Sequence, residues 1–69
     1  MLVEEGIVVA LDILRGLPST AHATTLREQA ESYARVVRHW ASIPPSAAQR
    51  DAMLDLVAVL QAEVAALTD

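Results

Sequence analysis

The histidines and carboxylates are the residues best suited to metal binding or acid–base chemistry, and their spacing forms no site. A di-metal carboxylate bundle needs Glu-x-x-His pairs that project inward. Neither His22 nor His39 has an acidic residue three positions before it. Asp51 and Asp55 share one face of a predicted helix, but that face is polar, and charged side chains on such a face are normally solvated. We therefore expect no metal site.

Nucleophilic catalysis and phosphate binding lack their usual residues as well. The chain has no cysteine, only two glycines and no Gly-x-Ser-x-Gly motif, so neither a nucleophile elbow nor a glycine-rich phosphate loop can be built. We expect no enzyme, no cofactor and no small-molecule ligand. The lowest-ranked alternative is an enzyme whose site forms between subunits of an oligomer.

The arginines suggest a second kind of chemistry, contact with nucleic acid. Arg35, Arg38 and His39 cluster on one predicted helix, with Arg27 further toward its start. The net charge of −4 and the pI near 4.9 oppose binding to a polyanion, because such binding depends on positive charge. A DNA-associated transcriptional regulator that uses these arginines is therefore kept as an alternative function.

Three helices must position all of these residues. Apolar residues recur at steps of four and three over residues 2–15, 25–42 and 46–67, which is the period of an amphipathic helix. The main stripes are Val3, Ile7, Ala10, Leu14 and Leu17; Leu26, Ala30, Tyr33, Val37 and Trp40; and Met53, Val57, Leu60, Val64 and Leu67. With short connections, these predict an all-α, three-helix antiparallel bundle with coiled-coil-like packing, forming a single domain over 1–69.

The residues between the stripes predict where the helices begin and end. Gly16 is expected to end the first helix in a left-handed conformation, before Pro18. Thr25 and Glu28 have the spacing of a capping box that starts the second helix, although an earlier start near Ser19 or Thr20 is also compatible with the sequence.

The second connection contains consecutive prolines. Pro44 and Pro45 are expected to end the second helix. Ser46 and Gln49 have the spacing of a capping box and are expected to start the third helix.

The first and third helices carry more apolar surface than one bundle of this size is expected to cover. Hydrophobic residues make up 54% of only 69 residues, and a core this small supplies about 3–5 kcal/mol unless something reinforces it. Without cysteine for disulfides, we expect association into a dimer or higher oligomer, or with a protein partner. The candidate interaction residues are Leu2, Val9, Ile13, Trp40, Leu54, Leu56, Val59 and Glu63.

Two of these candidates allow another interpretation. Trp40 lies at the edge of the apolar arc of its helix, where it serves either as a core anchor or as an interface hot spot. Glu63 interrupts the apolar side of the third helix, where it either extends outward to solvent or pairs with an arginine of a partner.

The hairpin from Thr25 to Leu67, with Pro44-Pro45 at its turn, resembles in outline the small hairpin co-chaperones of type III secretion systems. The resemblance covers about two-thirds of the chain, and helix one departs from a bare hairpin. It implies a co-chaperone function as a further alternative.

The apolar segment Leu2 to Leu17 is interrupted by Glu4, Glu5 and Asp12, and it is too short for a membrane span. It also lacks the basic start of a secretory signal, so we expect no membrane partner and a cytoplasmic location. The leading hypothesis is a small acidic helical protein-interaction module, acting as a regulator, adaptor or chaperone.

Overall fold

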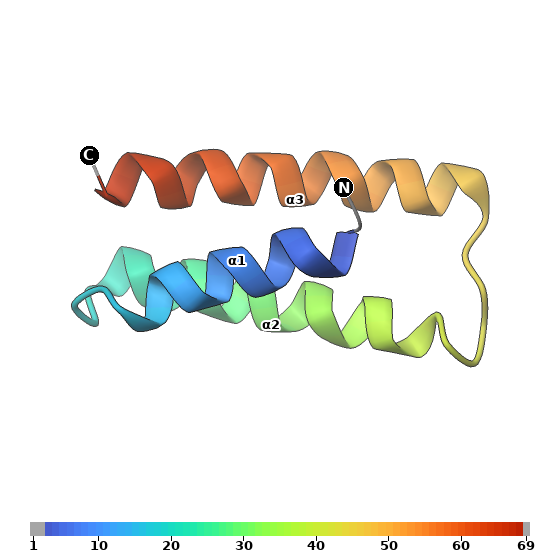
Figure 1. Cartoon of the computed structure of the whole chain (residues 1–69), viewed down its shortest axis with the longest axis horizontal. Helices are drawn as coiled ribbons and strands as arrows, with labels where there is room; N and C mark the ends of the chain where they lie inside the picture. The colour runs from blue at the N-terminus through green and yellow to red at the C-terminus, as the bar shows by residue number, and fades with distance from the viewer. Residues whose placement is uncertain (1–2, 69) are drawn as a thin grey trace.

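The computed structural model describes residues 3–68, which form three helices: α1 (Val3–Arg15), α2 (Ala21–His39) and α3 (Ala47–Thr68). α1 and α3 run in the same direction and α2 runs opposite to both, so consecutive helices are antiparallel (Figure 1). Each helix packs against the other two. The expected all-α three-helix bundle is therefore confirmed, and α1 belongs to the bundle of its own chain.

The end of α1 differs from the sequence prediction. Gly16 does not have a positive φ, so the predicted left-handed cap is wrong. Instead, the N–H groups of Gly16 and Leu17 donate to the carbonyls of Ile13 and Leu14, at 3.1 and 3.2 Å. These bonds span three residues, and the helix therefore ends in the tighter 3₁₀-type turn that commonly closes an α-helix.

The start of α2 agrees with the earlier alternative near Thr20 and not with the predicted capping box at Thr25. Thr20, not Thr25, is the N-cap, and its hydroxyl oxygen accepts a hydrogen bond from the Ala23 N–H at 3.1 Å. The Thr25 hydroxyl donates to the Ala21 carbonyl within the helix, as threonines inside helices often do. Both threonines can cap a helix, but the earlier start also buries Ala23 in the core, which the local motif could not reveal.

At its other end α2 stops at His39, three residues before the predicted boundary. The N–H groups of Trp40, Ala41 and Ser42 donate to carbonyls three residues earlier, so the chain continues to wind, but more tightly. The reason is Pro44, which disfavours a helical conformation at Ile43 and cannot donate a hydrogen bond itself.

The start of α3 agrees with the predicted capping box. The Gln49 N–H donates to the Ser46 hydroxyl oxygen at 3.1 Å, and the Ser46 N–H donates to Gln49 Oε1 at 2.9 Å. Two N–H groups that the first turn would leave unpaired are thereby satisfied. The helix then runs from Ala47 to Thr68, within one residue of the prediction.

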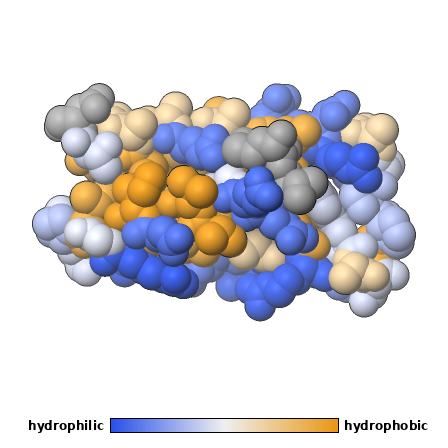
Figure 2. Space-filling view, viewed as in Figure 1, coloured by the Kyte–Doolittle hydropathy of each residue, from blue (hydrophilic) through white to orange (hydrophobic). Residues whose placement is uncertain are grey.

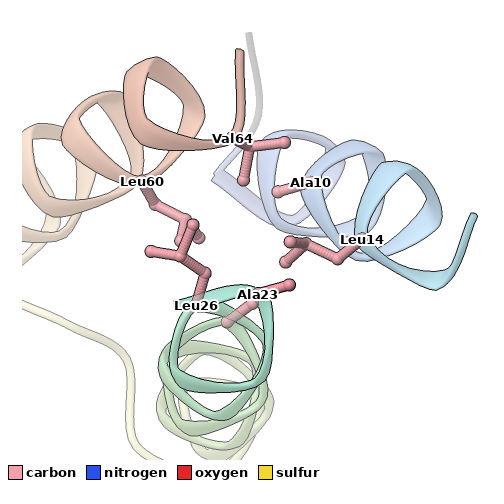
Figure 3. Close-up of a cluster of buried hydrophobic side chains, with 7 residues drawn as sticks. Ala10, Leu14, Ala23, Leu26, Leu60 and Val64 are labelled. Carbon is pink, nitrogen blue, oxygen red and sulfur yellow. The ribbon is translucent and has the colours of Figure 1, made fainter. Parts of the chain in front are cut away.

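The predicted stripes form the core, in two clusters along the bundle. In the cluster around the C-terminal half of α1, small and aliphatic side chains from all three helices converge (Figure 3): Ala10, Leu14, Ala23, Leu26, Ala30, Leu60 and Val64. The second cluster contains Val3, Ile7, Val37, Met53 and Val57. Leu11 and Tyr33 pack against both clusters and join them into one core.

The capping box gives a prediction about stability. Ser46→Ala leaves the Gln49 N–H without its partner, and we expect the free energy of unfolding to fall by about 1 kcal/mol. Urea denaturation followed by circular dichroism measures this change. Ser19→Ala, at an exposed loop residue, is the matched control and should be nearly neutral. Equal stability of the two variants would contradict a capping role for Ser46.

Candidate interaction surface

The described part of the chain contains no metal cluster, and an apolar groove lies between α1 and α2. Within residues 3–68 no three histidine, aspartate or glutamate side chains are grouped so that they could hold a metal ion. A groove of about 190 Å³ between α1 and α2 is lined mainly by apolar side chains, among them Val8, Leu11 and Ala34. It is smaller than the clefts of about 300–1,000 Å³ that usually bind small molecules.

Over the same residues, no helix is both long enough and apolar enough to cross a bilayer.

Arg27, which the sequence analysis grouped with the other arginines of the second helix, turns toward α1. One of its terminal nitrogens donates to the Leu14 carbonyl at 3.2 Å. A positive charge is favourable at this point, because the carbonyls at a helix C-terminus carry partial negative charge. Its Nε is buried and has no hydrogen-bond partner among the described residues. Arg27 is thus a structural residue, and Arg35, Arg38 and His39 remain as the exposed basic group.

Apolar side chains are also exposed, and they are the most distinctive surface feature. The large apolar residues with exposed side chains are Val8, Val9, Ile13, Val36, Ile43, Leu56 and Val59. Isolated exposed apolar residues are common on proteins, whereas contiguous ones mark interaction sites. Their arrangement around the bundle therefore matters more than their number.

The candidates on α1 lie on the side of the helix that borders α3. Gln61 Nε2 of α3 lies 3.5 Å from the carbonyl oxygen of Gly6, so Gly6 marks that side. With about 100° between successive residues, Val9 and Ile13 lie just beyond Gly6, away from α2. Val9 is 52% exposed and Ile13 is 39% exposed. Leu2, the remaining candidate near α1, lies outside the described residues.

The candidates on α3 divide between its two sides. Leu54 lies on the Gln61 side, next to α1, where it is half-buried against the second core cluster. By the same rotation, Leu56, Val59 and Glu63 lie on the opposite side of the buried stripe, next to α2. Leu56 and Val59 are 45% and 57% exposed, and Glu63 is half-buried.

Trp40 lies at the end of α2 near the Pro44-Pro45 turn. It is half-buried and packs against the second core cluster. It also lines an open depression together with Val36, Ile43 and Gln49, the last at the start of α3. Trp40 therefore contacts the core, as the core-anchor interpretation requires, and still presents part of its surface beside α3.

The candidates thus belong to two separate surfaces rather than one, each extended here by neighbouring apolar residues. The first, which we call the α1–α3 face, contains the candidates Val9, Ile13 and Leu54 and the neighbouring Ala58 and Ala65 of α3. The second, the α2–α3 face, contains Val36, Trp40, Ile43, Leu56, Val59 and Glu63. Figure 2 views the bundle with α1 in front and shows apolar side chains gathered over the C-terminal half of α1.

Sequence reasoning did not select three of the exposed apolar residues. Val8 stands among charged residues of α1 and borders α2 in the groove described above. Val36 flanks the main stripe of α2, and its exposure follows only from how far α3 covers that helix. Ile43 lies in the turn before Pro44, where no helical period exists to indicate its direction.

Comparison with known proteins yields no relative: neither a family model, nor a curated protein, nor a solved structure matches this chain.

The position of Arg27 gives a second prediction. Arg27→Ala removes a charged hydrogen bond and the packing of the side-chain stem. We therefore expect the free energy of unfolding to fall by about 1–2 kcal/mol. Arg35→Ala removes an exposed arginine of the same helix and should change stability by less than about 0.5 kcal/mol. Thermal denaturation of both variants makes the comparison. A neutral Arg27→Ala would show that the contact with Leu14 adds nothing to stability.

Proposed function

We propose that this chain is a protein-interaction module that acts by presenting apolar helix faces to another protein chain. The observation that carries the proposal is the coexistence of a closed core with exposed aliphatic side chains. Twelve hydrophobic residues are buried, and no polar or charged residue among residues 3–68 is buried with them. Val9, Ile13, Leu56 and Val59 are exposed even so.

The accessible surface area of the chain supports binding of a partner by a chain that is already folded, rather than folding that occurs only on assembly. The accessible surface of 4539 Å² is within about a tenth of the value expected for a monomeric protein of this mass. The three helices therefore enclose a core of ordinary extent, and the exposed apolar residues remain available to a partner. Surface apolar groups that the fold does not need are a cost to solubility, and an interaction offsets that cost.

A second copy of the chain is the simplest partner, and association is the property to measure first. We expect the purified protein to form a dimer or larger species by light scattering as its concentration rises from micromolar to millimolar. Leu56→Glu should reduce association through the α2–α3 face, and Val9→Glu should reduce association through the α1–α3 face, because a charge on an apolar contact must be desolvated. Both side chains are exposed, so circular dichroism should show an intact fold.

The control is Thr24→Glu, which adds the same charge at an exposed polar position on the outer side of α2 and should leave association unchanged. The same variants, used as bait, test for a different protein partner: the partner should bind wild type and Thr24→Glu but not the variant with the altered face. A chain that stays monomeric at millimolar concentration, and captures nothing that either face variant releases, would refute the proposed function.

A further inference from the structure

Resting on the proposed function, we propose that the α1–α3 face binds an amphipathic helix whose flanks carry basic side chains. The face consists of the exposed Val9 and Ile13 on α1, the half-buried Leu54 on α3, and the small residues Ala58 and Ala65 on α3. Small side chains let another helix approach closely, while Val9 and Ile13 supply apolar contacts. An apolar face of this kind is suited to the apolar stripe of a fourth helix.

The length of the face sets the length of its occupant. α1 contains 13 residues and is therefore about 20 Å long, at 1.5 Å per residue. A docked helix of about four turns would cover it. Such a helix needs apolar residues at steps of three and four, the same pattern that each helix of this chain uses to bury its own stripe.

The charges around the face determine what surrounds that stripe. Glu5 and Asp12 lie along the outer edge of α1, and Asp51 lies along the outer edge of α3; all three are exposed. The basic residues of these two helices are Arg15, which is 3.6 Å from Asp12, and Arg50, which precedes Asp51. Each helix contains three acidic residues and one arginine, so the acidic side chains remain in excess. An occupant with lysine or arginine on its flanks would complement these acidic edges, and an acidic one would be repelled.

The same charges make a second copy the poorer occupant of this face. In a twofold dimer each face meets its own equivalent, so two faces whose helices carry more acidic than basic residues would be brought together. The α2–α3 face differs, since Arg35 and His39 border it on α2 and Glu63 lies on α3. Self-association is therefore better served by the α2–α3 face, which leaves the α1–α3 face for a basic helix.

The test uses two designed peptides of about 16 residues. Each has leucines along one helical face; one has lysine on both flanks, and its twin has glutamate at the same positions. By fluorescence anisotropy, the lysine peptide should bind and the glutamate peptide should bind at least about tenfold more weakly. Binding of the lysine peptide should weaken at high salt, because exposed charges are screened. Equal affinity for the two peptides would overturn the proposal.

Paired variants locate the binding site. Val9→Ala with Ile13→Ala should weaken binding of the lysine peptide about tenfold or more, through lost apolar contact. Val36→Ala with Leu56→Ala, on the other face, should leave it unchanged. Alanine favours helix, so all of these variants should stay folded by circular dichroism. A greater loss with the Val36 and Leu56 pair would place the peptide on the α2–α3 face and overturn the proposal.

A second pair of variants separates charge from apolar contact. Glu5→Gln with Asp12→Asn should weaken binding several-fold and reduce its salt dependence. Glu28→Gln with Glu31→Gln changes net charge equally on α2 and should have little effect.

Two outcomes distinguish the possible occupants of the face. If the protein dimerises and Val9→Ala with Ile13→Ala dissociates the dimer, a second copy occupies the α1–α3 face and the proposal is overturned. Failure of peptide binding, combined with association that Leu56→Glu abolishes, would overturn this inference alone and leave the proposed function standing.

Discussion

The structure depends on one constraint: each helix has to bury a stripe of aliphatic side chains against two neighbours, using only three helices. Leu14, Leu26 and Leu60 meet from α1, α2 and α3 in one cluster, and Ala10, Ala23 and Ala30 beside them allow the backbones to approach closely. A triangular bundle satisfies this constraint because every helix faces both others. The loops, the caps and the Arg27 contact all serve to hold the three stripes in register.

The same constraint explains why apolar surface is left over. A helix in a triangular bundle buries only the arc between its two neighbours, so residues well to either side of the stripe remain in solvent. On α1 and α3 these flanking positions include Val9, Ile13, Leu56 and Val59. On α2 the outer positions are polar or charged, with Val36 as the large apolar exception. The surplus is thus a property of two helices, and it falls on two faces.

Charge then distinguishes these faces. α1 carries Glu4, Glu5 and Asp12 against Arg15, whereas α2 carries three arginines against two glutamates. The face between α1 and α3 is therefore bordered by acids, and the face between α2 and α3 is bordered by both signs. Apolar contact can supply affinity at either face, but the surrounding charges select different occupants. This difference is the basis for assigning a basic helix to one face and self-association to the other.

The sequence by itself determined the helices, their buried stripes and the cap of α3, because helical period and the Ser46–Gln49 box are local properties. It offered two starts for α2, a capping box at Thr25 and an earlier start near Ser19 or Thr20, and the structure uses Thr20 as the N-cap and buries Ala23 in the core. It grouped Val9 with Leu56 as one set of candidates. The tertiary structure separated them: Val9 lies where α1 borders α3, whereas Leu56 lies on the side of α3 that borders α2. How the helices pack decides this. The tertiary structure likewise turned Arg27 toward the Leu14 carbonyl, a contact between residues of different helices that no periodicity within one helix encodes.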